Sequence, residues 1–388
     1  MQELFITNIQ VGKVRNLENF DIMLSDNERR HLILTGKNGS GKTSLLDAMK
    51  DHIALQTHYI SHDHADDTIE SFPVILVNGV AVTNNVTAYD LKINYNYSSP
   101  QINDYIFAHI PAERQKLIMP TTIAPVNIKG KTAITINAGS AFLKYILHLD
   151  YRLYGARTDG NKQLEENLEK WFANFLAMLR EIYNCQELDL QRDTKNLAFK
   201  IIMPGYEPFG LNEMADGYSA LLNIVMELLM RMDDENAVVN YEKSGIAFID
   251  EMETHLHVEL QKRVLPFLTG LFPNVQFIVT THSPFVITSL GSAVVYDIER
   301  KERLENPSAY SYETVVESYF DTDMYSNEMK KVFKRYKELY SKERSPEEEV
   351  DFLKTKTELE LVPPASKELY FAFREMENKR KASENGKN

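Results

Sequence analysis

The sequence lacks the features of several protein classes. It has one cysteine, Cys185, among 388 residues, which excludes a disulfide framework and a cysteine-based zinc site. It also lacks any run of about 18 apolar residues, the length that a membrane-spanning helix requires. The N-terminal stretch MQELFITNIQ has no basic segment followed by an apolar one. We therefore expect no secretion signal, no membrane partner and a cytoplasmic location.

Positive charge is also scarce. Lysine and arginine number 43 against 56 aspartates and glutamates, so the formal net charge is −13. This balance argues against a protein with an overall basic footprint for nucleic acid. DNA contact is expected only through an assembly in which a local basic groove forms or a partner supplies part of the surface. The 43% of hydrophobic residues can fill one large domain with insertions, or two domains.

The order of predicted elements indicates an α/β fold. Short strands are expected in residues 2–35, and apolar strands alternate with helices in residues 245–298. This alternation favours a largely parallel sheet with helices on both faces. We expect an N-terminal lobe in residues 1–137, a helical insertion with a signature segment in 138–235, a C-terminal lobe in 236–298 and a charged helical tail in 299–388.

Three predicted helices have apolar faces. The first begins after Gly41, places Leu45, Leu46, Met49 and Ile53 on one face, and ends before a polar loop expected at residues 57–72. The second runs from Ser219 to about Met232. The last contains the sequence SKELYFAFREMENKRK and has Leu369, Tyr370, Phe373 and Met376 on one side. That side fits either packing within its own domain or docking of a partner.

Residues 36–43, GKNGSGKT, fit the P-loop pattern G-x-x-x-x-G-K-[ST], follow the strand HLILT and precede a helix. In this context the glycines let backbone N–H groups face a phosphate chain. Lys42 is expected to contact the β- and γ-phosphates, and Thr43 to hold Mg²⁺. A glycine turn without a ligand is the disfavoured alternative. The predicted ATP-binding residues here are Gly36, Lys37, Asn38, Gly39, Ser40, Gly41, Lys42, Thr43 and Ser44.

A pair of carboxylates follows the apolar strand GIAFI, which is the Walker B pattern. Asp250 is expected to bind Mg²⁺ through water, and Glu251 to orient and polarise the attacking water. Adjacent carboxylates at a strand end could instead cap the next helix. The P-loop earlier in the same chain favours the catalytic interpretation.

Four motifs occur in the order GKNGSGKTS, MADGYS, FIDEMETHLH and VTTHSP. With them, the chain resembles the RecF/SMC/OLD-like branch of the ABC-type ATPases. The resemblance implies that His282 is a catalytic switch residue that senses the γ-phosphate. It also implies that Asp216 and Gly217, just before the helix from Ser219, contact the ATP of a second copy. The opening hairpin matches that of the branch, with Arg15 near the nucleotide. The segment IPAER, around Glu113 and Arg114, is similar to one that recurs there.

The chain departs from this branch at several positions. Met214-Ala215 stands where Leu-Ser is common, Val258 replaces a common proline, and Gln115 is the one candidate for the Q-loop glutamine. The short helical gap excludes a long-armed SMC role. The Asp321-Thr322-Asp323 segment is interpreted as a turn rather than a Toprim metal site, so we expect no nuclease within the chain. The histidines and aspartates of residues 58–67 are interpreted as a solvated loop rather than a metal site.

The expected fold is thus a P-loop NTPase with an ABC-type head, and its cofactors are ATP and Mg²⁺. Within the branch it looks like the stand-alone AAA-annotated ATPases of bacterial anti-phage systems, such as the OLD, Septu and PARIS ATPases. This implies ATP hydrolysis, a head-to-head dimer or higher homo-oligomer, and control of a separate nuclease of Toprim or HNH type. The alternative is a RecF-like DNA repair ATPase that binds DNA directly. A transporter subunit is disfavoured by the opening hairpin and the helical tail.

Overall fold

The structure, a computed structural model, consists of two compact units, Met1–Val315 and Val316–Asn388. Each unit has a hydrophobic core of its own. The described residues are 3–61, 74–77, 80–83, 86–96, 105–114, 142–193, 196, 198–232, 239–304, 307–312, 314–315, 327–340, 344–361 and 367–385.

The first unit is built on a mixed six-stranded sheet in the order β14-β13-β3-β12-β11-β7. All neighbouring strands are parallel except the β13–β14 pair. Strands β3, β11 and β12 are buried along their whole length, as the apolar sequence runs predicted. The strands are β3 (Leu32–Thr35), β7 (Ile106–Ile110), β11 (Gly245–Ile249), β12 (Val275–Thr280), β13 (Val294–Asp297) and β14 (Glu302–Leu304).

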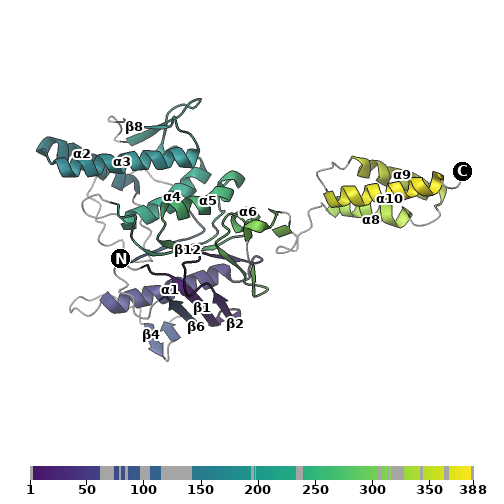
Figure 1. Ribbon diagram of the computed structural model, residues 1–388, viewed down its shortest axis with the longest axis horizontal. Coiled ribbons are helices and arrows are strands. Elements are labelled where there is room, and N and C mark those ends of the chain that lie inside the picture. Colours follow the sequence, from purple (N-terminus) through teal and green to yellow (C-terminus); the bar gives the residue numbers. More distant parts are fainter. Residues whose placement is uncertain are drawn as a thin grey trace. The chain divides into compact units, whose positions relative to one another are not determined.

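A second, antiparallel sheet has the order β2-β1-β6-β5-β4. Helix α1 (Lys42–Ser61) contributes Leu45, Leu46, Met49 and Ile53 to the core that both sheets share, as the sequence predicted. Figure 1 shows α1 on one side of β12, with α4 and α5 on the other. The strands are β1 (Ile6–Val14), β2 (Leu17–Met23), β4 (Val74–Val77), β5 (Val80–Thr83) and β6 (Val86–Tyr95).

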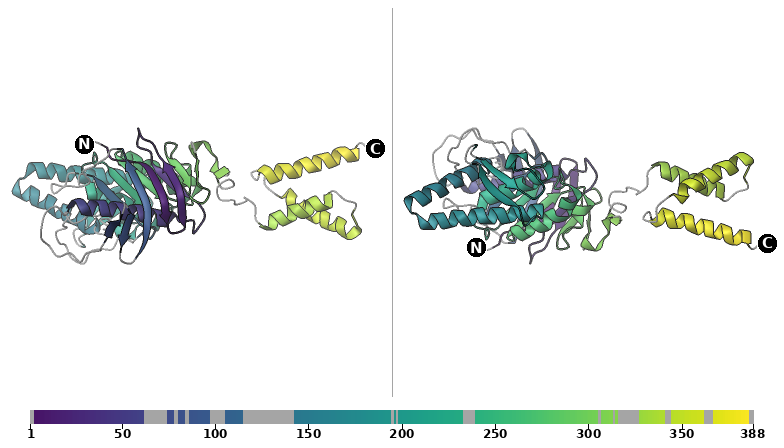
Figure 2. Two further views of the ribbon diagram at one scale, coloured as in Figure 1. Left: turned by 90° about the horizontal axis from the view of Figure 1, so that it is seen from below. Right: turned by 90° about the horizontal axis from the view of Figure 1, so that it is seen from above.

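Helices α2 (Phe142–Asp159) and α3 (Lys162–Tyr183) run side by side within the predicted insertion (Figures 1 and 2). They are joined by aromatic contacts, among them Tyr145 against Trp171 and Phe142 against Phe175. A small antiparallel sheet follows, made of β8 (Asp189–Asp193), β9 (Ala198–Ile202) and β10 (Phe209–Gly210). Its last strand leads toward α4 (Asp216–Met232), which contacts β7 and α5 (Val258–Leu271).

Three boundary predictions were wrong. Helix α1 continues through Ser61 instead of ending before residue 57, because residues 57–61 contain no glycine or proline to stop it. Helix α4 begins at Asp216 rather than Ser219. Asp216 suits the first turn of the helix because an acidic side chain is stabilised there. The sequence placed the start later because Gly217 is a poor helix former. Strand β14 lies in the segment predicted as helical, where it pairs with β13.

The second unit contains α8 (Asn327–Tyr340), α9 (Pro346–Glu360) and α10 (Lys367–Asn385). Its core consists of Tyr336, Leu339, Phe352, Leu359 and Phe373, with Tyr370 and Met376 packed against it. The apolar side of α10 is therefore used within the unit, which is one of the two roles that the sequence left open.

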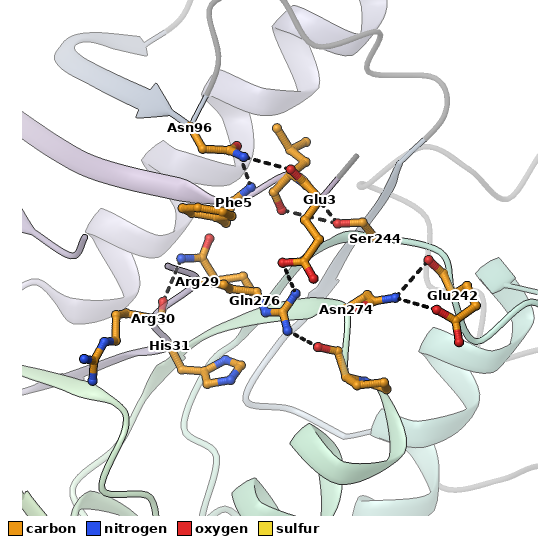
Figure 3. A network of polar contacts seen from close by, with 12 residues as sticks. Glu3, Phe5, Arg29, Arg30, His31, Asn96, Glu242, Ser244, Asn274 and Gln276 are labelled. Atoms are coloured by element: carbon orange, nitrogen blue, oxygen red, sulfur yellow. Dashed lines mark hydrogen bonds and ion pairs between the residues drawn. The ribbon is translucent and has the colours of Figure 1, made fainter. Parts of the chain in front are cut away.

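A buried polar network joins the two sheets at the amino-terminal ends of the parallel strands (Figure 3). The Gln276 side chain is fully buried; its Oε1 accepts from Ile6 N at 2.7 Å, and its Nε2 donates to Ile6 O at 3.0 Å and Arg30 O at 2.7 Å. His31 Nδ1 accepts from Phe277 N at 3.0 Å. These bonds tie β1, and the residues just before the P-loop strand β3, to strand β12 of the parallel sheet.

Candidate functional site

The loop after β3 has a conformation that requires glycine. Gly36, Gly39 and Gly41 have φ angles of 138°, 79° and 102°, which side chains disfavour. A Cβ at Gly41 would also lie 3.0 Å from Leu17 Cγ in the opening hairpin. The glycine spacing of the motif therefore matches a backbone that curls at the amino end of α1.

Lys42 lies over this loop and is buried. Its Nζ donates to Gly36 O at 2.9 Å and to Lys37 O at 3.0 Å. Burial lowers the pKa of Lys42, while the carboxylates of Glu253, Asp250 and Glu251 oppose that shift. The ammonium group is thus held by the carbonyls of the loop, next to the acidic residues that follow β11.

Thr43 and Asp250 meet between α1 and β11. Thr43 Oγ1 donates to Asp250 Oδ1 at 3.1 Å, and Thr280 Oγ1 donates to the same oxygen at 2.5 Å. Thr43 follows β3, Thr280 ends β12 and Asp250 follows β11. These three strands are neighbours in the sheet, so their carboxyl ends bring the residues together. The structure therefore brings together the two residues that the sequence assigned to Mg²⁺.

Glu251 has an unusual backbone. Its φ angle is 43°, in the left-handed region. Its N–H donates to Thr280 Oγ1 at 2.7 Å, and its carboxylate accepts from Thr254 Oγ1 at 3.1 Å. Arg114, just after β7, donates to the carbonyl oxygens of both Asp250 and Glu251. The Glu251 side chain is half-buried at the carboxyl edge of the parallel sheet.

Glu253 connects this acidic segment to the loop that carries His282. Its two oxygens accept from Thr281 Oγ1 and from His282 N, each at 2.6 Å. Burial and the charge of Lys42 lower the pKa of His282, with Glu253 acting in the opposite direction. His282 therefore lies within electrostatic range of both Lys42 and the acidic groups.

The remaining P-loop candidates have separate contacts. Arg15, with a φ of 52°, donates to Ser44 Oγ at 3.1 Å. Lys37, which is exposed, pairs with Glu299 at 3.3 Å. Ser40 N donates to Lys37 O, and Ser40 Oγ is buried without a hydrogen-bond partner in the described part of the chain. Asn38 is exposed in the same loop.

Asp216 and Gly217 form the first turn of α4. A Cβ on Gly217 would lie 3.0 Å from the carbonyl oxygen of His255 and 3.7 Å from the nitrogen of His257. The predicted signature segment thus rests on the backbone that follows Asp250 and Glu251. His255 itself has a φ of 66°.

Several sequence predictions lie outside the described residues. They are the candidate Gln115, the Asp321-Thr322-Asp323 segment and positions 62–67 of the histidine–aspartate cluster. Within the described ranges, no group of three or more histidine, cysteine, aspartate or glutamate side chains could hold a metal ion. The Thr43–Asp250 pair has one carboxylate, a donor set that suits Mg²⁺ when phosphate oxygens and waters complete its shell.

Three residues of this site had no role predicted from the sequence: Arg114, Glu253 and Thr280. A second glutamate two positions after Glu251 was visible, but nothing in its spacing shows that it reaches the next strand. Thr280 gave no signal, because threonine is common in buried strands. Arg114 was visible only within the recurring segment IPAER.

The fold and this arrangement are those of a P-loop NTPase. Residues 156–287 match the family described as "AAA ATPase domain". This match covers about a third of the chain, and parts of the chain are similar to a probable retron ATPase and to a Septu protein. None of the described helices combines the length and hydropathy needed to cross a bilayer.

The similar proteins match only part of their own length. The "Retron Ec83 probable ATPase" of Escherichia coli is 27% identical over 169 residues, which are 42% of this chain and 29% of the relative. "Septu protein PtuA" of Bacillus mycoides (strain KBAB4) is 33% identical over 94 residues, 24% of this chain and 13% of the relative. This chain thus spans less than a third of these relatives.

A solved structure, "Crystal structure of the SmcHead bound to the C-winged helix domain of ScpA", is 14% identical, with a TM-score of 0.44. The match covers 79% of this chain and 100% of the chain in that structure.

Proposed function

We propose that this chain binds and hydrolyses ATP between two heads, and that the cycle controls a separate nuclease in anti-phage defence. The observation that carries the proposal is the 3.1 Å contact between Thr43 of the P-loop and Asp250 at the end of β11. Two motifs more than 200 residues apart in the sequence converge on one place, as a nucleotide site requires.

The residues present fit ATP and Mg²⁺. The backbone turn at Gly36–Gly41 offers N–H groups at the amino end of α1, where a phosphate chain is stabilised. Lys42 would move from the loop carbonyls to the phosphates. Thr43 and Asp250 would hold Mg²⁺, which neutralises phosphate charge when it is bound.

Glu251 and His282 have separate tasks in this proposal. The Glu251 carboxylate orients a water molecule for attack and accepts hydrogen bonds from it. His282 senses the γ-phosphate from the loop after β12. The lowered pKa of His282 favours a neutral imidazole, which can accept or donate a hydrogen bond.

In this proposal, Asp216 and Gly217 of one head contact the ATP that is bound to the other head. The amino end of α4 has the helix dipole and N–H groups that suit a phosphate of the partner's ATP. Met214 and Ala215 supply no serine hydroxyl there, so the backbone makes this contact. In this proposal, the dimer closes around two ATP molecules.

The link to defence is supported by the retron and Septu relatives and by the family resemblance of the motifs. We propose that head closure or opening is passed to a nuclease of Toprim or HNH type encoded near this chain. Co-purification of the chain with the product of an adjacent nuclease gene, from cells that express both, tests this part. A chain that binds duplex DNA alone with a steep salt dependence would instead support a repair ATPase.

ATP binding and turnover are tested with two variants. Lys42→Ala should lose ATP binding, because the phosphates lose the buried lysine of the P-loop. Glu251→Gln should bind ATP with near wild-type affinity, hydrolyse it about 100-fold more slowly, and accumulate as a dimer in size-exclusion chromatography with light scattering. Lys13→Ala, which removes an exposed lysine paired with Glu18, is the matched control. Equal ATPase rates for the wild type and Glu251→Gln would overturn the assignment.

A further inference from the structure

Arg114 stands between the end of β7 and the acidic segment after β11. Its Nη1 donates to the carbonyl oxygens of Pro111 and Ala112, each at 2.8 Å. Its Nη2 donates to Asp250 O at 3.1 Å and Glu251 O at 3.4 Å. One guanidinium group therefore holds four carbonyl oxygens from two neighbouring strand ends.

Two of these carbonyls flank Glu251. The Asp250 carbonyl belongs to the peptide before Glu251, and the Glu251 carbonyl to the peptide after it. Between them the backbone has a φ of 43°, in the left-handed region that residues with a side chain rarely adopt. The N–H of Glu251 is fixed at the same time by Thr280 Oγ1 at 2.7 Å.

An arginine suits this task because its planar fork can serve several acceptors at once, whereas a lysine ammonium acts as a point charge. Burial lowers the pKa of Arg114 to about 10, against the opposing effect of Asp250, Glu253 and Glu251. The group thus stays charged at neutral pH. Its Nε has no hydrogen-bond partner in the described part of the chain, whereas its two terminal nitrogens donate to these four carbonyls.

The same side chain lines a small polar cavity of about 10 Å³. Asn223 and Glu227 of α4 also line it. Arg114 thus shares a cavity with α4 while it holds the backbone of Glu251.

We propose that Arg114 is a positioning residue for ATP hydrolysis, which holds the left-handed backbone at Glu251 and thereby aims its carboxylate. The proposal rests on the proposed function of Glu251 as the residue that orients water. Arg114 acts through Glu251 and touches neither nucleotide nor water in this assignment.

The test is a double-mutant cycle under single-turnover conditions with saturating ATP. Arg114→Ala should lower the hydrolysis rate by about 10- to 100-fold, since a misplaced catalytic group costs that much. Its ATP affinity should stay within about twofold of the wild type, because the P-loop is untouched. In the Glu251→Gln background, Arg114→Ala should lower the rate no further.

Two further variants keep the test decisive. Arg114→Lys keeps the charge and should remain at least about fivefold slower than the wild type, because it lacks the fork. Arg29→Ala is the matched control: Arg29 also binds a carbonyl, that of Pro273, but it lies in the polar network at the amino-terminal ends of the parallel strands (Figure 3). It should lower the melting temperature and leave the single-turnover rate unchanged.

The outcomes separate the two proposals. A wild type that hydrolyses no ATP, or is as fast as Glu251→Gln, sinks the proposed function. If Glu251→Gln is slow but Arg114→Ala lowers the rate equally in both backgrounds, the positioning role is wrong. Full activity of Arg114→Lys or loss of ATP binding in Arg114→Ala would also overturn it.

Discussion

The Thr43 hydroxyl donates a 3.1 Å hydrogen bond to the Asp250 carboxylate across 207 positions of the sequence. The two oxygens belong to residues far apart in the sequence and are joined by one hydrogen bond. A divalent cation that takes the place of this hydrogen bond would find a hydroxyl and a carboxylate already side by side, the groups that the P-loop and Walker B motifs supply.

Replacing Asp250 by asparagine should therefore remove the Mg²⁺ dependence of nucleotide affinity. In titration calorimetry with ATP, the wild type should bind at least about tenfold more tightly with Mg²⁺ than with EDTA. Asp250→Asn should show the same weak affinity in both buffers. Asp21→Asn, at an exposed position of β2, is the control and should keep the wild-type difference. An undiminished Mg²⁺ effect in Asp250→Asn would contradict the assignment.

Glu253→Gln should slow hydrolysis without weakening ATP binding. The amide retains one acceptor oxygen, so either Thr281 or the His282 backbone loses its bond, and a bond to a charged group is worth about 1.5–3 kcal/mol. We expect about a tenfold lower rate in a steady-state phosphate-release assay. The effect should shrink when His282 is already alanine. Glu259→Gln, which loses an exposed pair with Lys262, should behave as the wild type, and additive losses in the Glu253–His282 cycle would argue against the link.

The stability of the first unit should fall as the pH is lowered from about 6.5 toward 4. Burial lowers the pKa of His31 to about 4 from an ordinary 6.5. The unfolded chain therefore takes up a proton at a higher pH than the folded chain, and acid favours unfolding. The contribution reaches up to about 3 kcal/mol at the low end. Urea unfolding followed by the fluorescence of Trp171, the one tryptophan, measures it.

His31→Asn tests this origin of the acid sensitivity. Asparagine can accept the Phe277 N–H as His31 Nδ1 does but does not titrate in this range. The pH dependence should become shallower than in the wild type. Burial also lowers the pKa of His109 to about 4, so adding His109→Asn should flatten it further. An unchanged slope in the double variant would disprove the explanation.

Phe373→Ala should unfold the second unit at lower temperature. Phe373 is 1% exposed in a small core, and truncating a buried phenylalanine costs about 3–5 kcal/mol, a large share of what a domain of this size can have. Circular dichroism should show earlier loss of helix. The Trp171 transition should stay in place, since this residue belongs to the core of the first unit. Phe371→Ala, at a position 62% exposed, is the control, and a matching loss there would count against the prediction.

Much of this site could be predicted from the sequence because its motifs are local. The P-loop has glycines at the three positive φ positions and Lys42 in the next turn. Asp250 and Glu251 follow an apolar strand that is buried, as expected. The direction of the strands could also be predicted, because apolar strands alternating with helices favour a parallel sheet.

The rest depends on contacts that no local pattern records. Glu253 reaches the next strand, Arg114 reaches the end of β11, and both depend on the neighbour order of β7, β11 and β12. Gln276 is a polar residue inside a buried strand, and its hydrogen bonds to the backbones of Ile6 and Arg30 explain it. Element ends were missed for a related reason, since Gly217 and β14 take their conformations from packing against His255 and β13.

The position of β3 also bears on how the protein is made. Both of its neighbours in the sheet, β12 and β13, are encoded more than 240 residues later, as their spans show. During synthesis the P-loop sequence emerges early, yet its strand gains its first neighbour only when the chain has reached Thr280 and its second only at Asp297. The loop after β3 is therefore among the last parts of the first unit to gain its place in the sheet.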